Sequence, residues 1–250
     1  MRTPPTSPLR SALVLLCAAL AGPALAATDI DVVYGDDIAR RGELAAELAA
    51  RWSQSSRSGE LGGRTVWQGV GELAYGLSDN WNVGVKLPVA RIDGVWRAHD
   101  AYLETKYVAP HGAEGFYWGA EVEAGSVKPA GEERTLSIEA FPILGYRIKR
   151  LHLIANPGLE YSSEGEDKGW SFAPKAKIAY SLDALHAVGL EYHVDAGKLN
   201  DLAPRGKRQE TAYLTWDAKL GGKQFSLALG HGTTHRADRW ALRVGLELDD

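Results

Sequence analysis

The sequence has little of three things that shape many folds: cysteine, methionine and long hydrophobic runs. Its 250 residues include one Cys and one Met. Both stand before residue 27, so the rest of the chain has no disulfide framework. After residue 26 no run reaches the ~18 consecutive apolar residues of a membrane-spanning helix, which excludes a helical membrane protein. There is no basic surplus or Lys/Arg tract either, so no nucleic-acid partner is expected.

The first 26 residues have the composition of a secretory signal peptide. Arg2 and Arg10 give a basic start, SALVLLCAALAG is a short apolar core, and residues 24–26 (Ala-Leu-Ala) form a small-x-small cleavage site. The apolar run is too short for a retained membrane anchor, so we predict export through the inner membrane and cleavage after Ala26. Cleavage removes two Arg and no acid, which takes the formal net charge from −4 to −6.

What the remaining chain has in abundance is period-two alternation. GELAYGLSDNWNVGVKL, residues 71–87, consists of two alternating runs joined by the polar residues 78–80. Apolar residues occupy one face of each run, whereas Glu72 and Lys86 stand on the other face among small residues. This pattern predicts a strand, a tight turn and a second strand.

The same alternation recurs almost to the C-terminus and predicts twelve strands. Residues 42–53 also fit a helix, with Leu44, Leu48 and Trp52 at i, i+4 spacing, but we interpret them as a strand because they open the series. The predicted strands cover residues 42–53, 71–77, 81–87, 102–107, 116–123, 136–144, 151–160, 172–180, 188–193, 214–220, 225–230 and 242–248.

The connections between these strands alternate in length. Those at 78–80, 109–114, 149–150, 182–184 and 221–223 are short to modest, and those at 54–63, 128–134, 163–169 and 196–208 are longer or more polar. Outer-membrane barrels show this asymmetry, with short periplasmic turns and longer external loops. An even number of strands places both ends of the chain on the short-turn side. Pro88 directly follows the predicted strand 81–87, and Pro142 and Pro157 fall inside predicted strands. All three are expected to mark strand ends, bulges or poorly placed boundaries.

An alternating sheet also fits a soluble sandwich or a lipocalin-like barrel, and that alternative stays open. Three features favour a membrane barrel: strands of about ten residues can cross a bilayer at a tilt, Trp and Tyr stand mostly near strand ends, and the polar face mixes charges with Gly and Ala. Lipid cannot satisfy open sheet edges, so such a sheet must close. The predicted fold is therefore all-β, an antiparallel up-and-down transmembrane β-barrel of about 12 strands. Residues 1–26 are predicted as the signal peptide, 27–41 as an N-terminal periplasmic segment and 42–250 as the outer-membrane β-barrel. The charged stretch from Asp29 to Arg41 could form a short plug or a tail, and both interpretations stay open.

The polar face supplies a set of charged residues that would point into the lumen. Acids gather on the strands between residues 102 and 144, and bases gather on the strand 172–180. These side chains would either form a charge-selective pore or pair across the lumen and plug it, and both interpretations stay open. The predicted lumen-lining residues are Glu72, Lys86, Glu104, Lys106, Glu121, Glu123, Glu139, Lys175, Lys177, Glu191, His193, Asp217, Lys219, Arg243 and Glu247.

The run 71–81, GELAYGLSDNW, followed by Leu87-Pro88-Val89, resembles a hallmark of the MetA-pathway-of-phenol-degradation family of transporter-like outer-membrane barrels. In that family the second strand carries a Glu, an aromatic-Gly pair and a polar turn, and the third ends near Leu-Pro. The resemblance implies a barrel of roughly twelve strands that passes or binds small molecules, hydrophobic or aromatic ones among them. One departure is the C-terminus, Leu246-Glu247-Leu248-Asp249-Asp250, which lacks the terminal aromatic residue of most outer-membrane assembly signals.

The sequence gives little support for a catalytic site or a cofactor-binding site. His231 and Thr233 share the lipid-facing side by parity, as in an outer-membrane lipid hydrolase, but no orienting acid is evident on that face. Glu191 and His193 share the inward face, yet two ligands fall short of a zinc site. We therefore expect no enzyme, no metal and no cofactor.

The sequence predicts a porin-like channel or transporter of the Gram-negative outer membrane, with membrane lipid and small-molecule solutes as partners. The alternatives are a structural barrel with a plugged lumen and a lipid-modifying enzyme that uses His231. No particular oligomeric state follows from the sequence.

Overall fold

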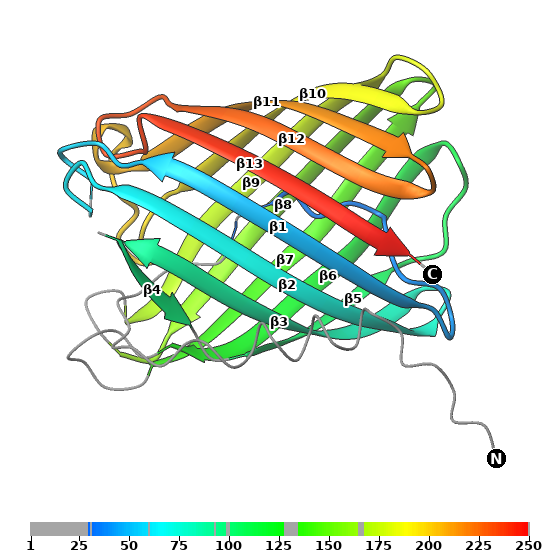
Figure 1. Cartoon of the computed structure of the whole chain (residues 1–250), viewed down its shortest axis with the longest axis horizontal. Helices are drawn as coiled ribbons and strands as arrows, with labels where there is room; N and C mark the ends of the chain where they lie inside the picture. Colours follow the sequence, from blue (N-terminus) through cyan, green and yellow to red (C-terminus); the bar gives the residue numbers. More distant parts are fainter. Residues whose placement is uncertain are drawn as a thin grey trace.

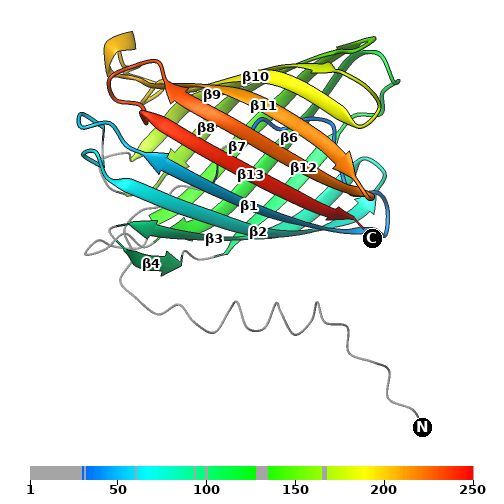
Figure 2. The same cartoon turned by 45° about the horizontal axis from the view of Figure 1, so that its top comes forward.

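The protein is described by a computed structural model, which covers residues 30, 32–59, 61–92, 94–98, 101–127, 135–164 and 168–249. These residues form a closed barrel of tilted antiparallel strands (Figures 1 and 2). The strands are β1 (Leu44–Gln54), β2 (Thr65–Ser78), β3 (Trp81–Ile92), β4 (Val95–Ala98), β5 (Tyr102–Val108), β6 (Gly115–Val127), β7 (Thr135–Ile148), β8 (Leu151–Ser162), β9 (Gly169–Ser181), β10 (His186–Asp195), β11 (Gln209–Leu220), β12 (Lys223–Gly232) and β13 (Trp240–Asp249).

Twelve of these strands make the barrel wall. Each pairs with its neighbours in chain order, β1 pairs with both β2 and β13, and β2 pairs with β3, so the sheet has no free edge. β4 pairs only with the end of β3 and stands beside the wall. The predicted fold, a twelve-stranded antiparallel barrel, is confirmed. Within the described ranges no helix is long and apolar enough to cross a membrane.

The structure extends several of the predicted strands, for example β3 to Ile92 and the start of β11 to Gln209, and it adds one strand. β2 begins at Thr65 rather than at residue 71, because its first residues already pair on both sides, Val66 with Ser53 of β1 and with Ile92 of β3. β4 was not predicted at all, since four residues are too few to show an alternating pattern. The ambiguous residues 42–53 form most of strand β1, as interpreted from the sequence. A strand is favoured over a helix here because β1 pairs with both β2 and β13 and so closes the barrel.

The outer face of the wall is apolar and exposed. Leu103, Leu190 and Leu214 keep 67%, 61% and 61% of their surface exposed, although each lies within a strand. Aromatic side chains also face outward near both ends of the strands: Trp81 lies opposite Tyr107 at the end with the short turns, and Trp52 lies opposite Trp67 at the other end. A bare apolar band between aromatic girdles is the surface that a bilayer covers.

The inner face holds the charged residues. Glu72 and Lys86 lie directly opposite each other on β2 and β3, and the Lys86 side chain is buried inside the barrel. The small residues beside them have a steric role. At Gly84, for example, a Cβ would collide with the Glu104 carboxylate, which crosses the inner surface of β3.

The three prolines lie inside β3, β7 and β8, so none of them marks a strand end, and at Pro88 the predicted boundary was poorly placed, one of the alternatives considered. An irregularity is found where two of them meet: the β7–β8 ladder is interrupted between Ala140 and Leu144, a stretch that includes Pro142 and faces Pro157. Proline has no N–H for the ladder. The freed carbonyl oxygen of Pro142 accepts a hydrogen bond from Asn156 Nδ2 at 3.2 Å.

Candidate functional site

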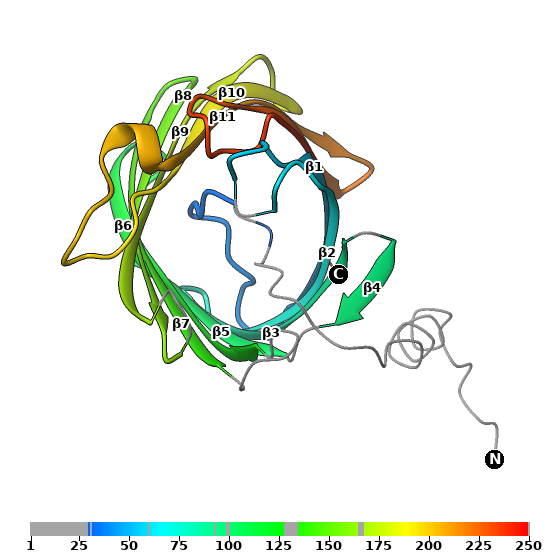
Figure 3. The same ribbon diagram turned by 90° about the vertical axis from the view of Figure 1, so that its left-hand side faces the viewer.

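The lumen contains a stretch of chain that is not part of the wall. This inner segment, defined as residues 30 and 32–41, runs inside the barrel (Figure 3). The sequence analysis assigned residues 27–41 to an N-terminal segment that could be a plug or a tail. The described residues of this segment run inside the barrel, where their side chains contact the wall. The segment leaves the barrel beside β2, where Arg41 pairs with Gly76. A Cβ at residue 76 would collide with the carbonyl group of Arg40, so this approach requires glycine.

Tyr34 is the main anchor of the inner segment. Its hydroxyl donates a hydrogen bond to Glu123 Oε1 at 2.5 Å and accepts one from Lys86 Nζ at 3.2 Å. Its ring lies 5.0 Å from the ring of Phe141, measured between centroids. The ammonium groups of Lys86, Lys106 and Lys175 lie 5.2, 5.9 and 5.8 Å from the ring centroid, within the range of cation–π attraction.

The backbone at Tyr34 is held as firmly as the side chain. Its N–H donates to Asn156 Oδ1 at 2.9 Å, and Asn156 Nδ2 donates to its carbonyl oxygen at 3.0 Å. The fully buried Asn156 thus bridges the inner segment to the interrupted β7–β8 ladder. At the interruption of the ladder near Pro142, the Asn156 side-chain amide thus bonds to the wall and to the inner segment at the same time.

Two aspartates next to Tyr34 make ion pairs with the wall. Asp36 accepts two hydrogen bonds from Arg147, from Nε at 3.0 Å and from Nη2 at 2.5 Å. Asp37 Oδ2 lies 3.1 Å from Lys106 Nζ, and the Lys106 ammonium holds the pKa of Asp37 below its ordinary value. The Asp37 side chain remains 58% exposed to the lumen, so water screens this second pair.

An apolar patch on the barrel wall also contacts the inner segment. Val108, Tyr117 and Ile143 form a buried cluster on β5, β6 and β7, and Tyr34 and Ile38 pack against it. Each of the three wall residues occupies an inward position that a water-filled pore would give to a polar side chain. The wall is therefore shaped for a protein segment at this level.

A second network crosses the lumen between β9 and β13. The buried Glu191 carboxylate lies 2.7 Å from Arg243 Nη2, 3.2 Å from Lys177 Nζ and 3.1 Å from His193 Nε2. Lys177 also lies 2.9 Å from Asp217. Glu191 and His193 are therefore joined to each other and to two cations, an arrangement that stabilises the buried charge.

At the end with the long connections, loops fold over the barrel mouth. Arg51 of β1 donates to Gln68 Oε1 at 2.6 Å and to Asp238 Oδ2 at 2.5 Å. Ser56 and Ser58 both donate to the carbonyl oxygen of His235, at 2.6 and 2.7 Å. These contacts tie the loop after β1 to the loop before β13.

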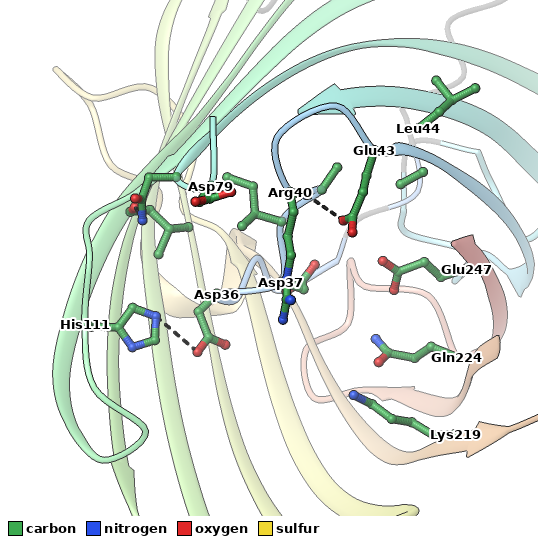
Figure 4. Close-up of a pocket in the computed structure, with 15 residues that line it drawn as sticks. Asp36, Asp37, Arg40, Glu43, Leu44, Asp79, His111, Lys219, Gln224 and Glu247 are labelled. Atoms are coloured by element: carbon green, nitrogen blue, oxygen red, sulfur yellow. Dashed lines mark hydrogen bonds and ion pairs between the residues drawn. The ribbon is translucent and has the colours of Figure 1, made fainter. Parts of the chain in front are cut away.

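At the end with the short turns the lumen opens into a cavity of about 760 Å³ (Figure 4). Asp36, Asp37 and Arg40 of the inner segment form one side of it. Lys219 and Glu247 come from the opposite wall, on β11 and β13. The cavity thus ends at the inner segment, and the two aspartates that pair with the wall are among the residues that line it.

The structure places the predicted lumen residues in separate groups. Glu72, Lys86, Glu104, Glu121 and Glu123 gather on β2 to β6, and Lys106 pairs with the inner segment. Lys177, Glu191, His193, Asp217 and Arg243 form the second network, and Lys175 lies over Phe141. Lys219 and Glu247 line the cavity, while Glu139 lies opposite Glu123 and Glu160 in the sheet.

The sequence analysis missed the residues that hold the inner segment, namely Tyr34, Asp36, Arg147 and Asn156. The alternation places Asn156 on the polar face together with His152 and Glu160, and parity could have placed Arg147 there too, but neither was singled out as a site residue. Nothing in the sequence signals that Tyr34 or Asp36 meets them.

The lipid-facing residues considered for hydrolysis lie at the rim. The His231 ring meets the edge of the Trp240 ring at 4.6 Å between centroids. Thr233 Oγ1 donates to the carbonyl oxygen of Glu210 at 3.2 Å. These contacts give both side chains a structural role, and the absence of enzymatic activity stays a prediction.

No family model matches the chain, and no curated protein matches its sequence. Its fold does match solved structures. It is similar to the COG4313 outer membrane channel from Pseudomonas putida F1, with a TM-score of 0.60, 12% identity, and coverage of 88% of this chain and 100% of that one. It is similar to the KdgM porin in complex with disordered oligogalacturonate, with a TM-score of 0.56, 9% identity, and coverage of 81% and 97%. A third match is the NanC porin, with a TM-score of 0.54, 9% identity, and coverage of 81% and 98%.

At these identities the likeness establishes the fold, which is that of outer-membrane channels and porins. The resemblance to the phenol-degradation family is not confirmed, because no model of that family or of any other matches the chain.

Proposed function

We propose that the protein is an outer-membrane channel for small molecules, and that the inner segment closes its lumen in the state described here. The observation that carries the proposal is the combination of a lipid-facing exterior with a charged interior that the wall itself does not fill. Small eight-stranded barrels are filled by their own side chains, and those of 16 to 18 strands leave a channel. In this barrel of twelve strands, a separate stretch of chain takes up the middle of the lumen.

The segment is held in a way that permits release. The hydrogen bonds and ion pairs that tie Tyr34, Asp36 and Asp37 to the wall involve side chains, whereas Arg41 forms a backbone bridge to Gly76 at the exit. Breaking these contacts would leave the twelve-stranded ladder intact. Likeness to outer-membrane channels and porins supports the proposal, and the charged walls favour polar solutes, since an apolar solute would strip water from buried charges.

Conductance across a planar bilayer tests this proposal. The mature chain is compared with a variant in which residues 30–41 are replaced by a Gly/Ser stretch of equal length. We expect rare or small steps from the first and frequent, larger steps from the second. Heat-dependent gel mobility verifies that both are folded. If both are silent, the barrel is a plugged structural protein and the channel proposal is wrong.

A further inference from the structure

A row of four glutamates crosses the inner face of the barrel. Glu104 lies directly opposite Glu123, Glu123 opposite Glu139, and Glu139 opposite Glu160, on the adjacent strands β5, β6, β7 and β8. Like charges that face each other across a sheet destabilise it. A row of this kind inside a barrel therefore requires positive charge close by.

The ammonium groups around the first half of the row are too few. Lys86 Nζ lies 2.6 Å from Glu123, 3.4 Å from Glu104 and 3.8 Å from Glu72, so a single cation serves three carboxylates. Lys106 lies opposite Glu121 but is paired with Asp37 of the inner segment. Five carboxylates thus share the ammonium groups of Lys86 and Lys106, and a third ammonium group, that of Lys175, lies near by over the Phe141 ring.

The carboxylate oxygens are placed to act as ligands of one ion. Glu104, Glu121 and Glu123 each offer an oxygen, and these three atoms lie within 4.8 Å of one another. The three side chains belong to residues that are 6%, 3% and 1% exposed. Glu123 uses Oε1 for Tyr34 and Lys86, whereas its buried Oε2 accepts no hydrogen bond from any described residue. Glu104 Oε2 is also buried and accepts no hydrogen bond, although the Lys86 ammonium lies 3.4 Å from it.

We propose that Glu104, Glu121 and Glu123 bind a divalent cation of the calcium type inside the lumen. Hard carboxylate oxygens suit Ca²⁺ and Mg²⁺ rather than softer metals. Ligands at ~2.6 Å from Ca²⁺ can lie up to ~5.2 Å apart across the ion, whereas those of Mg²⁺ are limited to ~4.2 Å. The upper limit of 4.8 Å on the separation of the three oxygens lies within the reach of Ca²⁺, and water would complete the coordination.

Lys86 lowers the affinity of this site because its ammonium lies beside Glu123. We therefore expect a Kd of roughly 10⁻⁴ to 10⁻³ M, as in extracellular calcium modules. The bound ion would fix Glu123 in the position from which it accepts the Tyr34 hydroxyl. The proposal does not depend on whether the lumen conducts, because it concerns binding to the folded barrel.

Calorimetric titration of the folded mature chain in detergent, stripped with EDTA, tests the site directly. CaCl₂ is the titrant, and MgCl₂ is the comparison. We expect one calcium per chain, weaker binding of magnesium, and a loss of at least about tenfold in calcium affinity in Glu104→Gln and Glu123→Gln. Glu247→Gln, at another lumen acid in the cavity on β13, is the matched control and should bind as the parent does.

Two results would overturn the proposal. One is that the parent takes up no calcium at about 10 mM CaCl₂. Protonated carboxyl groups in its infrared spectrum would then show that protons, rather than a metal ion, neutralise the row of glutamates. The other is an equal loss of affinity in Glu247→Gln. If the Gln variants do not fold, the parent alone decides, since a bound ion should raise its unfolding temperature in CaCl₂ over EDTA and an unchanged temperature contradicts the site.

Discussion

Truncating Tyr34 should release the inner segment in graded steps. Tyr34→Phe removes only the hydroxyl that bonds to Glu123 and Lys86. A hydrogen bond to a charged group contributes ~1.5–3 kcal/mol, so the ratio of docked to released segment should fall by about 10- to 150-fold. Tyr34→Ala also removes the ring pair with Phe141, worth ~0.5–1.5 kcal/mol, and the cation–π contacts, worth at least ~0.5 kcal/mol.

The assay is single-channel recording in planar bilayers, with the open fraction of time as the quantity compared. The order expected is parent, then Tyr34→Phe, then Tyr34→Ala, with each step at least a severalfold increase. Tyr146→Phe is the matched control, because the Tyr146 ring faces outward and is 45% exposed. If both Tyr34 variants fold and show the same open fraction as the parent, the inner segment does not close the lumen and the reasoning fails.

Three further predictions concern pH, the second network and the lipid face. Lys106 lowers the pKa of Asp37 when the segment is docked, so ionised Asp37 stabilises docking above its ordinary pKa of 3.8, and this stabilisation is lost as the pH falls through the pKa of the docked state. The open fraction of the channel should therefore rise below about pH 4, and Asp37→Asn should abolish this rise. Glu191→Ala leaves the Arg243 guanidinium buried without its carboxylate partner, so the free energy of unfolding in urea should fall by ~3–5 kcal/mol. A smaller loss than in an exposed Glu→Ala variant would mean that the second network does not stabilise the barrel. Leu190→Arg on the lipid face should cost ~2–4 kcal/mol in refolding into liposomes, with Leu190→Ala as the milder control; equal stability of the two would mean that this face does not meet lipid.

The sequence was sufficient to predict the wall because the wall is built from local patterns. Along each strand, lipid on one side and the lumen on the other impose period-two alternation, and short and long connections report the two ends of the barrel. Glu72 and Lys86 could therefore be assigned to the lumen from their parity alone. Strand bounds were less certain, as at Thr65, because pairing with both neighbours extends a strand beyond its clearest alternation.

The contents of the lumen were decided by the tertiary structure. Tyr34 meets Asn156 and Glu123 at separations of 122 and 89 residues, and Asp36 meets Arg147 at a separation of 111. No local pattern encodes such contacts, because they depend on how closure brings distant strands around one axis. The row of glutamates has the same origin: each Glu satisfied the inward parity of its own strand, and only the register of four strands set them opposite one another. The sequence by itself thus determined a closed barrel with a charged interior, whereas the tertiary structure decided that the interior holds an inner segment and a concentrated negative charge.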